Sequence, residues 1–391
     1  MIKPNYMKNR LVEIYSYILL IGLILVSCQE RGVGVGTTNA IDISINLDLN
    51  KPLKYNDLFK SIQYIPLETE SRSLIQSIDK LFVTDSGFLI FDSKQMNILL
   101  FNKDGSFIRQ IGQKGTGNNE YVYWNDIFFE KSTQLIYAHE RYQNRIYVYN
   151  LSGVLVNKTK KSRCSFSSFV KSRSGFWVYS CFKKPYNYDG YNLLLLDDSL
   201  QNVKASFFPQ KEFVNATTLS TFFTDNNENS YFFYPSGNKI FKLEQEVPIP
   251  YCKVDFGKHT LPYNNILQIS NSAEYENLVS NHNYLGDIKS FKTNGKFIYF
   301  SFCGTDYNKP VNNYNCLYNV SKDKTYLYEN PFIESLKYPV SSMLLQVSGE
   351  LLIYALYPIV LSGDSFTMLS KDVGKQISEE SNPILVIVKS K

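Results

Sequence analysis

The 391-residue chain has no strong excess of either charge. Its 41 Lys and Arg residues and 36 Asp and Glu residues are interspersed, which gives a formal net charge of +5. A nucleic-acid partner is therefore not expected, because a phosphate backbone requires clustered cations. Alanine is also scarce, with six residues, whereas the chain has 30 Tyr and 27 Phe. Because aromatic and β-branched residues favour pleated strands, this composition predicts an all-β protein.

Motifs of the common catalytic and metal sites are missing. His139, His259 and His282 belong to no spacing that would place zinc ligands on one face. The chain also lacks the Gly-x-Ser-x-Gly motif of α/β-hydrolases. We therefore expect no cofactor and favour a protein without catalytic activity, although residue order alone leaves the question of an enzyme open.

The apolar run near the N-terminus is too short to span a bilayer. It covers Ile14 to Val26, thirteen residues, and follows three basic residues, as in a secretory signal. The run ends in Leu25-Val26-Ser27-Cys28, which resembles a bacterial lipoprotein box, so Cys28 is the predicted lipidation site. Several acyl chains on one cysteine would anchor the protein stably without crossing the membrane.

This N-terminal pattern divides the chain into three parts. Residues 1–27 are the predicted signal peptide, residues 28–39 are the lipidated cysteine and a flexible Gly-rich tether, and residues 40–391 are the folded domain. The predicted location is the cell envelope, as an outer-membrane lipoprotein that faces the periplasm or the cell surface. The membrane is then a partner through the lipid.

The remaining five cysteines are an odd number for an exported protein. Cys164 and Cys181 lie symmetrically about a turn, and Cys303 and Cys316 flank a loop. Each pair could therefore face across a hairpin and form a disulfide. The alternative is buried free thiols, which are common in protein cores.

A turn followed by an apolar run recurs six times in the predicted domain. The second positions of the copies are spaced 46, 42, 55, 65 and 54 residues apart. Periods of this size, each with several short strands, are typical of β-propeller blades, which pack against their neighbours to bury their faces. The copies are Ser86–Phe91, Ser132–Tyr137, Ser174–Tyr179, Asn229–Tyr234, Asn294–Tyr299 and Ser348–Ile353.

A second repeated unit supports the same frame. Asn97–Ile108 and Arg145–Val156 each consist of a strand, a Gly-containing turn and a strand, at an offset of 48 residues. The last copy, Ile384–Val388, leaves no room for a fourth strand after it. We therefore expect Ile41–Leu47 to supply the outer strand of the last blade and to close the ring. The predicted fold is a six-bladed β-propeller with four-stranded antiparallel blades.

Four segments resemble the six-bladed β-propeller lipoproteins of Bacteroidota. They are Ser61–Thr69 (SIQYIPLET), Gly112–Tyr121 (GQKGTGNNEY), Asp255–Lys258 (DFGK) and Asn382–Val386 (NPILV). The resemblance covers about residues 40–391, and the family is similar to NHL-repeat and TolB-like propellers. One departure is that Asn118-Asn119 stand where the family pattern has Pro-Gly. The resemblance implies the fold and carries little about function, because members of the family are mostly described by fold alone.

The repeat alignment indicates which loops surround the central channel on one face. In a propeller, the loops between the second and third strands and the loops between blades gather there, and ligands generally bind there. In the first two blades these loops carry charges and flat aromatic rings, which suit glycan or peptide recognition. The alternative is that the rings pack between blades and the charges are solvated. The candidate ligand-binding residues are Asp92, Glu120, Tyr121, Trp124, His139, Glu140, Arg141 and Tyr142.

Three functions are compatible with this sequence. We favour a lipid-anchored, non-catalytic module that binds a glycan, a peptide or another envelope protein. The second is a calcium-dependent lactonase, hydrolase or lyase with its metal in the channel, because calcium ligands drawn from several blades would form no motif. The third is a scaffold for other envelope proteins, which a large apolar patch on one face would support.

Overall fold

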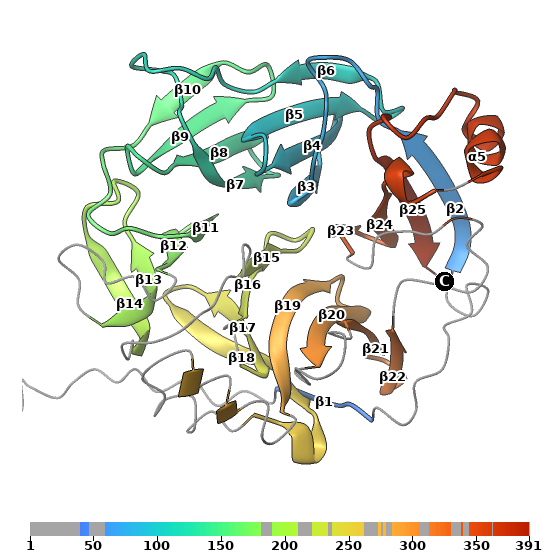
Figure 1. Ribbon diagram of the computed structural model, residues 1–391. Coiled ribbons are helices and arrows are strands. Elements are labelled where there is room, and N and C mark those ends of the chain that lie inside the picture. Colours follow the sequence, from blue (N-terminus) through green and yellow to red (C-terminus); the bar gives the residue numbers. More distant parts are fainter. Residues whose placement is uncertain are drawn as a thin grey trace, which may run out of the picture. The chain divides into compact units, whose positions relative to one another are not determined.

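The domain is a ring of six antiparallel sheets, the blades of a β-propeller (Figure 1). All described residues belong to one structural unit, which begins at Gly36. The predicted signal peptide and tether, residues 1–39, lie outside the described residues. The computed structural model describes residues 40–46, 59–180, 190–209, 221–233, 237–261, 273–274, 277–278, 284–304, 313–329, 338, 344–361 and 363–390.

In blades 1 to 5, four strands follow one another from the ring axis outward. Blade 1 contains β3 (Lys80–Val83), β4 (Gly87–Asp92), β5 (Asn97–Asn102) and β6 (Phe107–Gln110). Blade 2 contains β7 (Trp124–Glu130), β8 (Leu135–Glu140), β9 (Arg145–Asn150) and β10 (Leu155–Lys158). Blade 3 contains β11 (Ser168–Ser172), β12 (Gly175–Tyr179), β13 (Tyr191–Leu196) and β14 (Val203–Pro209). Blade 4 contains β15 (Phe222–Thr224), β16 (Ser230–Phe233), β17 (Lys239–Glu244) and β18 (Val247–Asp255). Blade 5 contains β19 (Leu285–Thr293), β20 (Phe297–Gly304), β21 (Asn313–Asn319) and β22 (Lys324–Glu329).

Blade 6 is built from both ends of the domain. Its three inner strands are β23 (Gln346–Ser348), β24 (Leu351–Leu356) and β25 (Ile384–Ser390), and its outer strand is β2 (Phe59–Pro66). Ring closure by an N-terminal strand is therefore confirmed, but the expectation that Ile41–Leu47 is that strand is wrong. The eight residues of β2 pair along the whole of β25, which has seven residues, and β2 continues directly into the loop that leads to blade 1.

The segment expected to close the ring joins blade 4 instead. β1 (Ile41–Ser44) pairs in parallel with β18 and becomes a fifth strand at the outer edge of that sheet. Ile43 is fully buried in a cluster that includes residues of blades 4 and 5. The hydroxyl of Thr325, in β22, donates a hydrogen bond to the Ser44 carbonyl over 3.4 Å. The chain from β1 to β2 thus connects the outer edges of blades 4 and 6.

The six repeated segments form the second strands of the six blades, as predicted. In blades 1 and 3 this strand is buried along its whole length, because a neighbouring blade packs against each of its faces. Gly87 and Gly175 begin these two strands. A Cβ at Gly87 would lie 2.1 Å from the Phe101 carbonyl oxygen, and one at Gly175 would lie 2.0 Å from that of Leu196. At these two positions, glycine is therefore required by the close approach of the third strand.

The predicted disulfides are not seen among the described cysteines. Cys164 is a buried free thiol, and its expected partner, Cys181, lies outside the described residues. Cys316 is also a buried free thiol. The register pairs Cys316 with Phe300 and Cys303 with Asn313, three positions along the ladder, so the prediction that these two cysteines face each other is wrong.

Helical structure is confined to the connections between strands. The helices whose bounds are described are two 3-10 turns, η2 (Gly257–His259) and η3 (Pro358–Val360), and one α-helix, α5 (Ser365–Val373). Residues 273–274 and 277–278, between β18 and β19, are also helical. Across the described ranges, no helix combines the length and the apolar character needed to cross a membrane.

Candidate functional site

Two sets of loops surround the ring axis. Because adjacent strands are antiparallel, the loops between second and third strands and the loops between blades lie on one face, which we call the upper face. The loops between first and second strands lie on the opposite, lower face. All eight candidate ligand-binding residues belong to the upper-face loops of blades 1 and 2 or to the strand ends beside them.

Two of the candidate carboxylates hold these loops in place. Asp92, at the end of β4, is fully buried and accepts backbone N–H bonds from Gln76, Lys94 and Gln95 at 2.6 to 3.0 Å. Glu140, at the end of β8, is also fully buried. It accepts backbone N–H bonds from Tyr123 (3.0 Å) and Gln143 (2.5 Å). Each carboxylate therefore joins the preceding inter-blade loop to a loop of its own blade, and the two aligned positions have the same role.

Glu120 holds the glycine-rich loop before blade 2. Its carboxylate accepts hydrogen bonds from the Gly117 N–H (2.8 Å) and from the side-chain amide of Gln113 (3.0 Å). A Cβ at Gly115 would lie 2.0 Å from a Glu120 carboxylate oxygen. The carboxylate thus occupies the space that the missing side chain leaves.

Two candidate aromatic residues are core residues. Tyr121 and Trp124 are fully buried and stack on each other with ring centroids 4.3 Å apart. The Tyr121 hydroxyl accepts a hydrogen bond of 2.9 Å from the Gln110 side chain. These rings pack between blades 1 and 2, which corresponds to the second interpretation considered for the sequence.

His139 is a buried, uncharged residue. Its ring stacks on Phe166 with centroids 4.0 Å apart. Its Nδ1 lies 3.3 Å from the Asn125 amide nitrogen and its Nε2 lies 3.1 Å from the Asn144 amide oxygen, an arrangement that fits the tautomer with its proton on Nε2. Burial lowers the pKa of His139 to about 4, and the positive charge of Arg141 acts in the same direction.

Arg141 and Tyr142 are the most exposed of the candidates on the upper face. Tyr142 is 68% exposed, and its ring lies edge-on to that of Tyr123, 6.1 Å away. The Arg141 guanidinium lies over the ring of the same Tyr123, 5.5 Å from its centroid. We call Tyr123, Arg141 and Tyr142 the platform. The Glu140 carboxylate holds the backbone of the platform in place, because it accepts the N–H groups of Tyr123 and of Gln143, the residue after Tyr142.

The innermost strands carry a buried ion pair. The Lys80 ammonium, on β3, lies 2.6 Å from the Asp126 carboxylate, on β7, and donates a second bond to the Ile127 carbonyl. The other Asp126 oxygen accepts the Phe169 N–H of β11. Burial raises the pKa of the Asp126 carboxyl, and the Lys80 ammonium opposes this. The pair therefore connects blades 1, 2 and 3 beside the axis.

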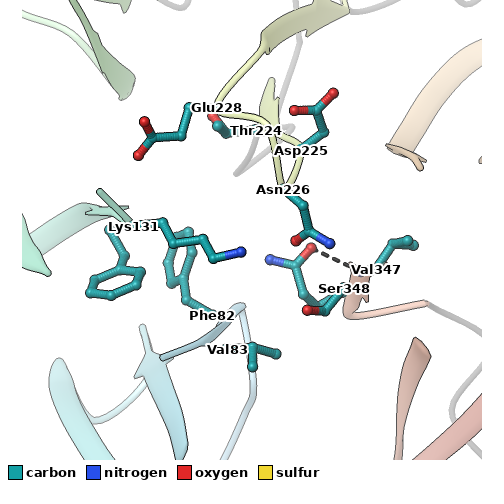
Figure 2. A pocket seen from close by; sticks show the side chains of 11 residues that line it. Phe82, Val83, Lys131, Thr224, Asp225, Asn226, Glu228, Val347 and Ser348 are labelled. Carbon is teal, nitrogen blue, oxygen red and sulfur yellow. Dashed lines mark hydrogen bonds between the residues drawn. The ribbon is translucent and has the colours of Figure 1, made fainter. Parts of the chain in front are cut away.

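A small open pocket lies on the lower face, where the inner strands end (Figure 2). Its lining comes from blades 1, 2, 4 and 6 and includes Phe82, Lys131, Asn226 and Gln346. Figure 2 shows the Lys131 ammonium extending into the pocket toward the Asn226 side chain. A hydrogen bond of 2.8 Å from the Ser132 N–H to the Glu228 carboxylate joins the lower-face loops of blades 2 and 4 at its edge.

The sequence of the propeller domain matches one known protein family. Residues 38–389 match a family described as a domain of unknown function, DUF4934. The chain belongs to the DUF4934 family. The search of curated proteins found no match.

Solved structures agree with the family's propeller fold. A Bacteroides fragilis protein assigned as exported superposes with a TM-score of 0.72 and 19% identity, over 90% of this chain and 99% of that chain. A member of the DUF4221 family from Bacteroides vulgatus superposes with a TM-score of 0.51 and 11% identity, over 85% of this chain and 97% of that chain. The fold of this DUF4934 chain and the Bacteroides relatives agree with the resemblance to Bacteroidota propellers.

Carboxylate clusters of the kind that bind calcium are not found in the described part of this DUF4934 chain. No three His, Cys, Asp or Glu side chains among the described residues are grouped so that they could hold a metal ion. The carboxylate of Asp126, on an inner strand, is engaged with an ammonium and a backbone N–H. The feature that would favour the calcium-dependent enzyme over a binding protein is therefore not seen in these ranges.

The lower-face pocket was missed by sequence analysis because its residues lie far apart in the chain. Lys131 and Asn226 each stand in the turn before a repeated second strand, so the repeat alignment places them at the same end of their blades. A comparison of the six turns would have shown that blade 2 brings a lysine to this end. The sequence analysis instead predicted ligand binding on the upper face.

Proposed function

We propose that this protein is a non-catalytic binding module of the cell envelope, anchored by a lipid on Cys28, that binds a glycan or peptide at the platform. The platform presents a phenol ring and a guanidinium to solvent, held by a buried carboxylate. Flat rings stack on the apolar faces of sugars or on peptide side chains, and the guanidinium donates to hydroxyl, carbonyl or carboxylate oxygens.

Two further observations support the envelope location. The sequence at Leu25–Cys28 resembles a lipoprotein box after a short apolar run. The Bacteroides fragilis relative of the same fold is assigned as exported. Orientation toward the periplasm or toward the exterior is part of what the experiment below can settle.

Binding at the platform can be tested with paired substitutions. We expect Tyr142→Ala or Arg141→Ala to weaken binding of any oligosaccharide or peptide found in a panel screen by tenfold or more, as for central aromatic and arginine contacts. The matched control is Arg72→Ala. Arg72 is exposed and lies 5.9 Å over the Phe107 ring but belongs to no part of the platform. Equal affinities for the wild type and both platform variants would contradict the proposed site.

The lipid anchor has its own test. In a bacterium that processes lipoproteins, the wild-type chain should fractionate with membranes and incorporate labelled palmitate, whereas Cys28→Ala should do neither. Protease treatment of intact cells then separates a surface-exposed protein from a periplasmic one. A wild-type chain that takes up no label, or a Cys28→Ala variant labelled as strongly as the wild type, would contradict a lipid anchor on Cys28.

A further inference from the structure

The segment that leads from blade 2 to blade 3 is basic. Residues 158–163 (KTKKSR), which we call the basic segment, contain four cationic side chains and no carboxylate. Lys160, Lys161 and Arg163 are exposed. The segment includes the last residue of β10 and continues toward the start of β11, so it lies on the upper face. Short runs rich in Lys and Arg are typical of surfaces that bind polyanions.

Hydrogen bonds hold the basic segment against the loop that carries the platform. That loop begins with Arg141 and Tyr142 and ends with Asn144. The Asn144 carbonyl accepts the Ser162 N–H over 2.7 Å. The Asn144 side-chain amide donates to the carbonyls of Ser162 (3.1 Å) and Cys164 (3.0 Å). Because two cationic residues flank Ser162, the positive charge of the basic segment lies beside the platform.

The glycine-rich loop before blade 2 brings further positive charge to the same part of the upper face. It covers residues 111–123 and ends in the first residue of the platform. Lys114, in this loop, is exposed. The Lys158 ammonium donates hydrogen bonds to the main-chain and side-chain oxygens of Asn118, so the basic segment also contacts this loop. The carboxylate of the loop, Glu120, already accepts hydrogen bonds from within the loop.

Two carboxylates of blade 3 lie near the basic segment but have partners of their own. The hairpin between β13 and β14 contacts the segment, since the Gln201 side chain donates to the Lys161 carbonyl over 2.7 Å. Asp197 accepts hydrogen bonds from within this hairpin, and Asp198 forms an ion pair of 3.1 Å with Lys171. Within the described ranges, none of the exposed cations of the three loops is part of an ion pair; they are Lys114, Arg141, Lys160, Lys161 and Arg163.

This distribution of charge favours a ligand with several negative charges. The three loops carry five exposed cations and one carboxylate, that of Glu120, which is hydrogen-bonded. Cations on loops that contact one another add their fields, which attract an anionic partner. A chain of repeated acidic units can contact several of these side chains at once, and linked contacts strengthen one another.

The shape of the surface favours a glycan over an acidic peptide. The free strand edges of blades 1 and 2 belong to β6 and β10, at the rim of the ring (Figure 1). The upper face of these blades presents strand ends and loops, to which a peptide backbone cannot pair as an added strand. It also presents the Tyr142 ring, which is exposed and can stack on the apolar face of a sugar.

We infer that the platform and the basic segment together bind an acidic glycan, a chain of sugars that carry carboxylate or sulfate groups. The inference rests on the proposed function, since it names the class of glycan that the platform takes. Tyr142 stacks on a sugar ring. The guanidinium of Arg141 and the ammonium groups of the basic segment donate charge-assisted hydrogen bonds to acidic groups on successive units. Because these cations are exposed, binding weakens as salt is added.

Calorimetric titration of the full-length chain with an oligogalacturonate and with a dextran sulfate oligosaccharide tests the inference. The first probe carries only carboxylates and the second only sulfates, so together they identify the anionic group. The matched neutral probes are methyl-esterified oligogalacturonate and dextran. We expect saturable binding of at least one acidic probe, tenfold or more tighter than binding of its neutral counterpart, and weaker binding at higher salt.

Substitutions separate the basic segment from the platform. The double variant Lys160→Gln/Lys161→Gln should weaken binding of the acidic probe about three- to tenfold, since two exposed charge contacts are lost. Tyr142→Ala should also weaken it, since the stacking ring is lost. The matched control is Lys322→Gln/Lys324→Gln, which removes two exposed lysines from the outer hairpin of blade 5 and changes the net charge equally.

The outcomes distinguish this inference from the proposed function. Equal affinity for an acidic probe and its neutral counterpart, with both lost in Tyr142→Ala, would overturn the acidic ligand and leave binding at the platform in place. Binding that the double variant of the basic segment weakens but Tyr142→Ala does not would contradict the platform in both proposals. An oligoglutamate bound as tightly as the acidic probe would overturn the choice of a glycan. No saturable binding of either acidic probe, or an equal loss in the control variant, would overturn the inference.

Discussion

Two buried carboxylates, Asp92 and Glu140, hold the loops of the upper face in position. Asp92 and Glu140 each accept backbone N–H groups from two separate loops, so one side chain sets the relative position of both. A loop that carries exposed functional groups is often ordered in this way by a residue that never touches the ligand. The platform is therefore expected to depend on Glu140 as much as on its own members.

Replacement of Glu140 provides the first prediction. Glu140→Gln keeps one acceptor oxygen and loses the other, so one buried N–H is left without its partner. We expect a loss of about 1–3 kcal/mol in the free energy of unfolding, measured by urea denaturation. The control is Glu120→Gln, whose partners are more exposed and whose loss should be smaller. Equal losses in the free energy of unfolding for the two variants would contradict the role of Glu140 in holding the two loops together.

The second prediction concerns His139 and acid. Its pKa is lowered in the folded state to about 4, below that of the unfolded chain, so the unfolded chain binds more protons between these values. The stability contributed by the neutral ring is fully present above pH 6.5 and is lost as the pH falls toward 4. The loss amounts to about 3 kcal/mol. Comparison of urea midpoints across this range for the wild type and His139→Gln should show a flatter profile in the variant, and parallel profiles would refute the assignment.

At the scale of strands, the repeated turn requires glycine where two strands approach closely. Gly175→Ala would place a methyl group 2.0 Å from a backbone oxygen, and its φ of +131° is unfavourable for alanine. We expect a loss of about 2–4 kcal/mol, since the third strand must move. Gly295→Ala is the matched control. Its φ is +81° but nothing lies within 4 Å of the added methyl group, so about 1 kcal/mol is expected in thermal or urea unfolding.

Strand-level features were the most predictable from sequence. The second strands are apolar, start at Gly or Ser turns and recur at blade-sized intervals, and all six are found where expected. The choice of the closing strand was wrong because both Ile41–Leu47 and Ser61–Thr69 alternate suitably, and only the length and register of β25 distinguish them. Side-chain roles were less predictable. The sequence shows that Asp92 and Glu140 are carboxylates, but their partners come from loops that only the folded ring brings together.

For the molecule as a whole, the segment from β1 to β2 makes two contributions that truncation can separate. Removal of residues before 47 deletes β1, including buried Ile43, and should cost about 2–5 kcal/mol while leaving the ring closed. Removal of residues before 67 also deletes β2 and exposes the edge of β25. We expect this shorter chain to aggregate or to unfold without cooperativity, because an open edge strand pairs with other chains. Size-exclusion chromatography and thermal unfolding measure both outcomes, and a monomeric, cooperative protein lacking β2 would contradict the closing role.

The position of β2 also has a consequence for biosynthesis. The strand is made near the beginning of the chain, but β25, its partner, is made about 320 residues later. At a translation rate of roughly 5–20 residues per second, β2 waits about 15–60 s before the partner exists. Ring closure is therefore one of the last steps in the folding of the newly made chain. A holding chaperone that keeps β2 covered until β25 can pair with it would therefore raise the yield of native protein more than one that acts after the ring has closed.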